Sequence, residues 1–189
     1  MASISRGVKR QRKNCLGRMF HRRELCSCKK RGPKVGNTRK GKGTKWMVLA
    51  DGNGTPLGAY LDAATPSEIS LVEKTLDAVS VRKASSPGRP RKRPKRLIGD
   101  KGYDSNKLRK KLKRMGIEPI FPARSNHPNA TDQDGRKLRR YRKRWIIERT
   151  FAWLGNFRRL VVRYERSVAI YSGFFSLACA ISVLKRILQ

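Results

Sequence analysis

Positive charge is concentrated in three blocks of the sequence, and these blocks limit where a hydrophobic core can form. Residues 1–45, 82–114 and 136–166 hold 43 of the 47 Lys and Arg residues, whereas the chain has only 13 Asp and Glu residues. Hydrophobic residues make up 38% of the chain, which is enough for a core of modest size. The formal net charge of +34 predicts a polyanionic partner, and nucleic acid is the usual one. By itself this composition favours a ribosomal or histone-like protein that coats nucleic acid.

The segments outside the basic blocks predict an α/β domain with a mixed sheet. Residues 1–45 show no apolar period and are predicted to be disordered or a nucleic-acid-binding arm, with residues 1–28 as a separate basic segment. Downstream, "WMVLA" and "LGAYL" flank "DGNG", which is typical of a β-hairpin, and "TPSEISLVEKTLDAV" has helical spacing. A basic loop over residues 82–96 leads to a strand, "RLIGD", then a helix and a short strand. A long helix is predicted from Lys137 to about Leu160, followed by an apolar helix over 168–188.

The apolar C-terminal segment raises the question of a membrane. Residues 168–184 carry no charge, but they fall short of the roughly 20 residues that a membrane helix needs, and Ser and Gly interrupt them. They are therefore predicted to form a buried helix of the domain, with no membrane partner. The N-terminus is basic with no apolar run after it, so we expect no signal peptide and a cytoplasmic protein associated with the nucleoid.

Two acidic residues stand out in this basic chain. Asp100 follows the apolar run of a predicted central strand, where α/β sheets present their chemistry. Glu148 shares one helical face with Tyr141 and Arg144, and this face is predicted to pack inward. A buried glutamate there must be paired or must bind a metal. Periodicity alone favours the first alternative, a structural pair between Arg144 and Glu148 at i, i+4 spacing.

The same two carboxylates also suit metal-dependent phosphoryl transfer. Mg²⁺ prefers oxygen ligands, and two ions about 4 Å apart can activate water or a 3′-hydroxyl and stabilise the leaving oxygen. Lys and Arg around such a site would hold the phosphate backbone.

From about Lys29 to Leu188 the chain resembles bacterial insertion-sequence transposases of the DDE class, which have an RNase H-like catalytic core. The segments that carry this resemblance include "RLIGDKGYDSNKLRKKLKRMGIEPI" and "GRKLRRYRKRWIIERTFAWLGNFRRLVVRYER". The family's Tyr-x₂-Arg-x₃-Glu signature falls on Tyr141, Arg144 and Glu148, and its strand-end acid falls on Asp100. The resemblance implies that Asp100 and Glu148 are catalytic and bind Mg²⁺ or Mn²⁺. The expected DNA-binding residues are Tyr141, Arg144, Arg149, Arg158, Arg159 and Lys101.

The chain departs from the family pattern at its N-terminal end. The family's first acid lies on the first strand, shortly before a Lys-Lys-Gly-Gly run, but alignment on Lys29–Lys30 places Arg22 there. A lysine that often follows the signature glutamate is replaced by Gly155, and the family's N-terminal region is missing. The resemblance therefore implies a partial catalytic domain over 29–189, with an RNase H-like mixed sheet flanked by helices and a first strand that is missing or disrupted.

A shift of reading frame offers one explanation for this departure, and we state it as a hypothesis. Codons can be written for Met19–Cys28 that, read one nucleotide later, give Cys-Phe-Ile-Asp-Gly-Ser-Phe-Val-Pro, a segment of the family type. Residues 1–28 would then be translated out of frame, or ribosomal slippage near Lys29–Lys30 would join two frames. The gene's nucleotide sequence decides the matter, since the hypothesis is wrong if the other frame encodes no Asp-Gly-Ser-type strand.

The sequence thus predicts a partial transposase that binds transposon-end and target double-stranded DNA. Intact relatives are expected to use Mg²⁺ for strand cleavage and for transfer of the freed 3′-hydroxyl. With its first acid missing, this chain is expected to be inactive alone, and a homodimer on DNA stays open. The alternatives are a catalytically inactive, basic DNA-binding remnant and, third, a ribosomal-type RNA-binding protein.

Overall fold

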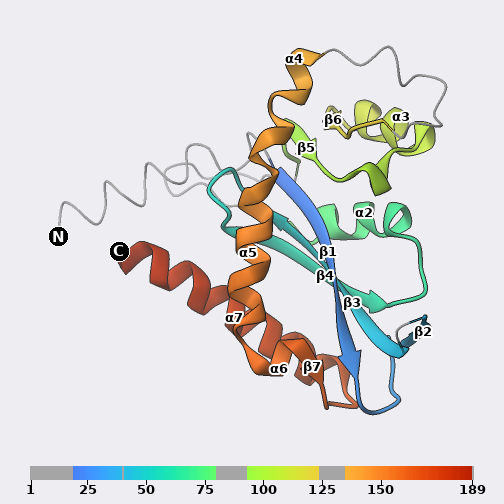
Figure 1. The fold of residues 1–189 in the computed structure, drawn as a ribbon, viewed down its shortest axis with the longest axis vertical. Coiled ribbons are helices and arrows are strands. Elements are labelled where there is room, and N and C mark those ends of the chain that lie inside the picture. The colour runs from blue at the N-terminus through green and yellow to red at the C-terminus, as the bar shows by residue number, and fades with distance from the viewer. Residues whose placement is uncertain (1–18, 40, 80–92, 124–134, 189) are drawn as a thin grey trace.

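The computed structural model describes residues 19–39, 41–79, 93–123 and 135–188, in which helices lie on both faces of one mixed sheet (Figure 1). The strands are β1 (Met19–Cys28), β2 (Gly36–Thr38), β3 (Gly41–Ala50), β4 (Pro56–Ala63), β5 (Arg96–Ile98), β6 (Glu118–Ile120) and β7 (Val162–Arg163). The α-helices are α2 (Glu68–Asp77), α3 (Asn106–Arg114), α4 (Gly135–Leu138), α5 (Trp145–Gly155), α6 (Arg158–Val161) and α7 (Val168–Leu188). Two 3₁₀-helices, η1 (Lys101–Tyr103) and η3 (Tyr141–Arg144), complete the described elements. The predicted mixed α/β class is confirmed.

The first strand is present, so the prediction that it is missing or disrupted is wrong. β1 pairs antiparallel with β3 from Phe20↔Ala50 to Ser27↔Gly43, and parallel with the start of β5 at Met19↔Leu97 and Phe20↔Ile98. Without a strand between β3 and β5, their facing N–H and C=O groups would lack partners. Backbone hydrogen bonds between strands do not require regularly spaced apolar side chains, so a segment without such spacing can still form a strand. Residues 19–28 therefore lie in the sheet, although the sequence placed them in a separate segment; residues 1–18 lie outside the described residues.

The predicted hairpin is confirmed as β3 and β4. Asp51 shapes its turn, because its Oδ1 accepts hydrogen bonds from the backbone N–H groups of Asn53 and Thr55, each at 2.8 Å. Gly54 adopts a φ of 85°, a conformation that residues with a Cβ rarely take. The "DGNG" segment therefore supplies both the hydrogen-bond acceptor and the backbone freedom that the turn needs.

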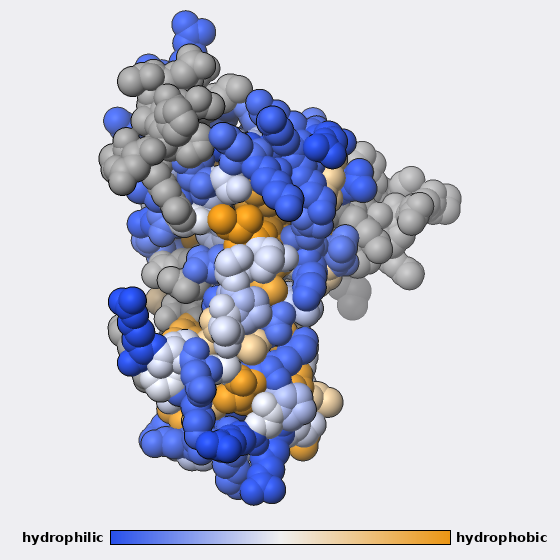
Figure 2. Space-filling view, turned by 90° about the vertical axis from the view of Figure 1, so that its right-hand side faces the viewer, coloured by the Kyte–Doolittle hydropathy of each residue, from blue (hydrophilic) through white to orange (hydrophobic). Residues whose placement is uncertain are grey.

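Alternate residues of β3 pack into cores on opposite faces of the sheet. Trp46 and Val48 lie in the core beneath α5 and α7, together with Ile147 and Phe175. Met47 and Leu49 lie in the core beneath α2 and α3, with residues such as Leu71 and Leu108. Figure 2 views the molecule from its α3 side, where hydrophilic side chains cover most of the surface and apolar ones reach it in patches. The hydrophobic core is therefore divided into two clusters, one on each face of the sheet, and both faces of the central strands are covered.

The long helix predicted from Lys137 to Leu160 is broken into four shorter elements, so that prediction is corrected. The chain runs through α4, η3, α5 and α6, with a cap at Asn156 after Gly155. Tyr141 and Arg144 thus belong to η3, one element before Glu148. The buried residues of α5 are Ile146, Ile147, Thr150, Phe151 and Leu154. These residues define a core-facing stripe that does not include Glu148.

Helix α7 spans the predicted range, but it buries only one of its faces. Tyr171, Phe175, Ala178 and Ser182 are buried at spacings of three and four residues. Ile170, Leu177 and Leu184 are more than half exposed. The helix was predicted to be buried, and the structure corrects this to a half-buried amphipathic contact. By length and composition, α7 is also the one candidate membrane span among the described residues.

Candidate active site

Asp100 lies just beyond the C-terminal end of β5, where the sequence predicted a functional acid. Its Oδ1 accepts a hydrogen bond of 2.7 Å from the backbone N–H of Lys101 and so caps η1. The strand can end here because Gly99 has no side chain: a Cβ at this position would come within 2.9 Å of the Phe121 ring and 3.0 Å of the Tyr103 ring. Capping alone would explain an aspartate, but 55% of the Asp100 side chain is exposed and faces further polar groups.

Arg144 joins Asp100 to Glu148. Its Nη1 lies 3.3 Å from Asp100 Oδ1, and its Nη2 lies 2.9 Å from Glu148 Oε1. The predicted Arg144–Glu148 pair therefore exists, but the guanidinium bridges two acids and does not serve Glu148 alone. Glu148 was predicted to be buried, whereas 38% of its side chain is exposed, because it lies beside the core-facing stripe of α5. The geometry thus unites the two predicted acids at one partly solvated point.

Tyr141 completes this group from η3. Its hydroxyl donates to Asp100 Oδ1 at 3.4 Å, and the Arg144 guanidinium lies 5.4 Å from the centre of its ring. Burial raises the pKa of Tyr141, Arg144 lowers it and Asp100 raises it further. The phenol is therefore neutral at physiological pH and acts as a hydrogen-bond donor.

A second acid of the same "DKGYDS" segment is structural. Asp104 is buried, and its Oδ1 accepts from Arg109 Nε at 2.8 Å. Arg109 also donates to the carbonyl oxygen of Phe121, which ties α3 to the end of β6. This segment therefore combines one exposed acid, Asp100, with one buried acid that fixes the loop around it.

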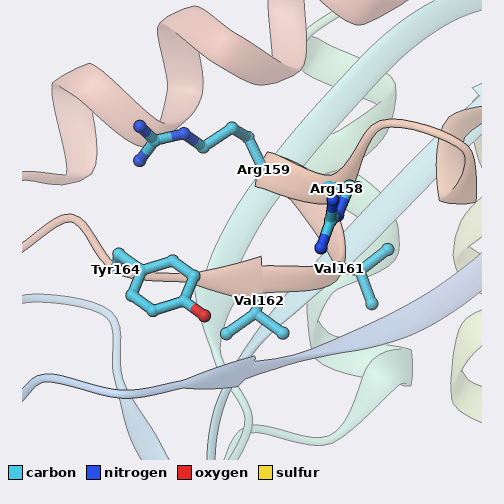
Figure 3. Close-up of a pocket in the computed structure, with 5 residues that line it drawn as sticks. All are labelled: Arg158, Arg159, Val161, Val162 and Tyr164. Carbon is cyan, nitrogen blue, oxygen red and sulfur yellow. The ribbon is translucent and has the colours of Figure 1, made fainter.

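The other predicted DNA-binding residues fall into two groups. Lys101 follows Asp100 directly, and Arg149 lies on α5 one residue after Glu148. Arg158 and Arg159 lie on α6, at the opposite end of α5 (Figure 1). There they line a hollow of about 570 Å³ with Val161, Val162 and Tyr164 (Figure 3). This hollow does not lie at the acids, and a broad opening with few convergent polar groups suits a surface contact better than chemistry.

The sequence did not single out Trp145, Trp153 and Arg186, although they lie beside Arg149. The Arg149 guanidinium carbon is 4.7 Å from the Trp145 ring centre and 4.9 Å from the Trp153 ring centre. The spacing of Trp145, Arg149 and Trp153 at i, i+4 and i+8 was the available signal. Arg186, from α7, could be added only by the fold.

Comparison with known proteins identifies the family. The model of the family described as "Transposase DDE domain" matches residues 19–183. The chain belongs to the transposase DDE domain family. It is 36% identical over 152 residues to a protein assigned as the transposase of insertion sequence element IS402 of Burkholderia cepacia, covering 79% of this chain and 68% of that protein. It is 32% identical over 93 residues to the protein assigned to element IS6501 of Brucella ovis, covering 47% of this chain and 67% of that protein.

The fold of this transposase domain is also similar to that of a solved transposase. The piggyBac transposase in a synaptic complex with hairpin DNA matches with a TM-score of 0.55 and 11% identity. The match covers 87% of this chain but only 45% of the piggyBac chain. This similarity supports the RNase H-like architecture of the mixed sheet.

In this transposase domain, position 22 and Asp100 follow the same pair of residues on two parallel strands. Phe20 of β1 pairs with Ile98 of β5, and each of the two positions lies two residues further along its parallel strand. Residue 22 is an arginine, in the place where the resemblance expects the first acid. Among the described residues, no three His, Cys, Asp or Glu side chains group as metal ligands. The strand register thus agrees with the position that the resemblance assigns to the first acid, and the sequence has arginine there.

These residues fit one metal ion better than two. Mg²⁺ is commonly bound by one or two carboxylates, with water and substrate phosphate completing its coordination. Asp100 and Glu148 could supply those carboxylates once Arg144 releases them. A pair of ions needs a further shared carboxylate, and no third acid joins this group among the described residues.

Proposed function

We propose that this chain is the DNA-binding part of a transposase catalytic domain whose active site is incomplete. The observation that carries the proposal is the convergence of Asp100, Arg144 and Glu148 beyond the C-terminal end of β5 in a domain of this family. In an intact relative, the acids that correspond to Asp100 and Glu148 would hold Mg²⁺. The metal would supply Lewis-acid activation for strand cleavage. The chain would act on transposon-end and target DNA in the cytoplasm, where the nucleoid lies, and two copies would act together.

The remaining side chains have supporting roles in this proposal. Arg144 positions Glu148 while no metal is bound, and it contacts a phosphate once the carboxylates are engaged. Tyr141 holds Asp100 through its hydroxyl group. Lys101, Arg149, Arg158 and Arg159 contact the phosphate backbone, a role that suits exposed cations.

Arg22 favours a second candidate, an inactive DNA-binding remnant. An arginine offers no oxygen ligand to a metal ion, so a site that lacks the first acid should bind metal weakly. The reading-frame hypothesis would account for this arginine, since Asp falls at the same position in the shifted frame. Sequencing the gene around codons 19–28 tests that hypothesis directly.

Strand cleavage tests the proposal. We expect the chain to bind a labelled duplex taken from the DNA flanking its gene, and to leave it uncut with Mg²⁺ or Mn²⁺. Arg22→Asp should gain metal-dependent nicking, and Asp100→Ala should remove that gain. Cleavage by the unchanged chain that Asp100→Ala abolishes would contradict inactivity. Failure to prefer the flanking duplex over a shuffled one would contradict end recognition, and failure of Arg22→Asp to bind Mn²⁺ more tightly would contradict the assignment of position 22.

A further inference from the structure

Four side chains from α5 and α7 form a continuous stack at the molecular surface. In order they are Trp145, Arg149, Trp153 and Arg186, and we call them the indole–guanidinium stack. The Arg149 guanidinium carbon lies between the two indoles, 4.7 Å and 4.9 Å from their centres. The Arg186 guanidinium carbon lies 4.2 Å from the Trp153 ring centre. Arg149 therefore contacts both indoles, and Trp153 contacts both guanidinium groups.

The β3–β4 turn holds the two guanidinium groups together. Arg149 Nη2 and Arg186 Nη1 both donate to the carbonyl oxygen of Asn53, at 3.2 Å and 2.8 Å. Arg186 Nη1 also lies 3.3 Å from the hydroxyl of Thr55. The stack is thus fixed by a turn distant in sequence, which restricts the freedom of its long side chains before any ligand binds.

Two cations lie close together here without a carboxylate bonded to either. In the part of the chain that the structure describes, neither Arg149 nor Arg186 forms an ion pair, and Arg186 Nη2 has no hydrogen-bond partner. Burial lowers the pKa of Arg186, the neighbouring Arg149 lowers it further, and Asp51 opposes both effects. Such like-charge repulsion would be relieved by a bound anion.

The outer end of the stack is an open aromatic surface beside the acids. Trp145 is 52% exposed even though Arg149 lies over its ring. It directly follows Arg144, the residue that links Asp100 to Glu148, and lies three residues before Glu148 on the same helix. Residues three apart are neighbours on a helix surface. A planar ligand on Trp145 would therefore lie next to the candidate catalytic group.

We propose that the indole–guanidinium stack binds an unpaired nucleobase of DNA on the open surface of Trp145, with an adjacent phosphate attracted by Arg149. Aromatic side chains stack on any base, and Arg strengthens such platforms through cation–π contact. Base pairs within a duplex hide the faces of their bases, so the ligand has to be a terminal, frayed or displaced nucleotide. This inference rests on the proposed DNA-binding function and adds recognition of an unpaired base beside the acids.

Binding to matched DNA probes tests the inference. One labelled duplex carries a short thymine overhang, and its partner carries an abasic overhang of the same length and charge. The chain should bind the thymine overhang about tenfold more tightly. Trp145→Ala should remove this preference without changing affinity for the abasic probe, and Trp145→Phe should retain most of it. Leu177→Ala, at an apolar position of α7 that is 57% exposed, is the matched control and should keep the preference.

The outcomes separate the two proposals. If the chain binds duplex DNA but does not distinguish thymine from abasic overhangs, or if Trp145→Ala keeps the preference, the stacking inference alone is overturned. Binding to no DNA at all would overturn both. A change in self-association with Trp145→Ala, with the base preference intact, would assign this surface to protein contact and overturn the inference.

Discussion

At the scale of single residues, the bridging guanidinium of Arg144 explains how two acids sit close together in so basic a chain. Each of its terminal nitrogens faces a different carboxylate, so one side chain offsets the repulsion between Asp100 and Glu148. The three groups are partly exposed, and water screens their attraction. The arrangement therefore positions the acids more than it stabilises the fold.

We expect Arg144→Ala to change function more than stability. The free energy of unfolding should fall by about 1 kcal/mol or less, because exposed ion pairs contribute little. Arg144→Ala should weaken duplex binding. Arg144→Lys should not restore that binding, since the single side-chain nitrogen of lysine cannot contact both acids in the same geometry. Urea denaturation and fluorescence anisotropy with a duplex check the two parts. A large loss of stability in both variants would indicate that the bridge is structural.

Cysteine reactivity gives a pH-dependent prediction at the same scale. Burial raises the pKa of Cys26 to about 11 and that of Cys179 to about 12. At pH 8 the reactive thiolate of Cys26 should therefore be scarcer by about a thousandfold than the protonated thiol. Labelling of the native protein followed by peptide mass spectrometry should leave both residues unmodified, and labelling in denaturant should modify both. Rapid native labelling would mean that this part of the core opens.

At the scale of elements, α7 shows how a helix can contribute half of its surface to the fold. Its buried side supplies Tyr171, whose hydroxyl accepts from Trp46 Nε1 at 2.6 Å and donates to the Leu160 carbonyl oxygen at 2.8 Å. Phe175 meets the Trp46 ring edge-on, with ring centres 5.4 Å apart. These contacts attach α7 to the middle of β3, and its opposite face stays exposed.

Two substitutions on α7 should therefore differ sharply. Phe175→Ala should lower the free energy of unfolding by about 3–5 kcal/mol, because it leaves a cavity against Trp46. Leu177→Ala, only two residues away but 57% exposed, should change it by less than about 0.5 kcal/mol. Chemical denaturation of both variants measures the difference. Equal losses would mean that the exposed face of α7 is also packed.

At the scale of the whole molecule, a net charge of +34 would set the strength and the salt dependence of the proposed DNA binding. Charge of one sign over the surface attracts DNA before any specific contact forms. Most of the Lys and Arg residues lie outside the group formed by Asp100, Arg144 and Glu148. Loss of metal-dependent cleavage would therefore not require loss of DNA binding. Under the proposed function, loss of the first acid would therefore leave DNA binding in place.

Binding to duplex DNA should weaken steeply as salt rises. A protein that neutralises several phosphates loses about a thousandfold or more in affinity between about 50 mM and 200 mM salt. Anisotropy titrations at several salt concentrations give the slope, and Arg158→Ala should reduce it by about one contact. An affinity that does not change with salt would contradict a phosphate-dominated interface.

Sequence patterns predicted those helices and strands in which the spacing of apolar residues matches the face that is buried. The hairpin around "DGNG", the strand before Asp100 and the apolar C-terminal helix follow from local spacing. β1 could not be predicted this way, because its segment has no apolar period and its stability comes from ladders with β3 and β5. The break of the long helix at η3 was missed for a related reason: the spacing of Tyr141, Arg144 and Glu148 is helical, yet only packing decides where a helix ends.

By itself, the sequence determined a basic α/β domain with two candidate acids, Asp100 and Glu148, and an arginine in place of the first. These properties depend on residue type and local spacing. Only the tertiary structure decided that Arg144 bridges both acids, that residues 19–28 form a strand between β3 and β5, and that Arg186 joins Trp153 and Arg149 in one stack. Each of these depends on contacts between residues far apart in the chain, and such contacts form only when the sheet and its helices pack together.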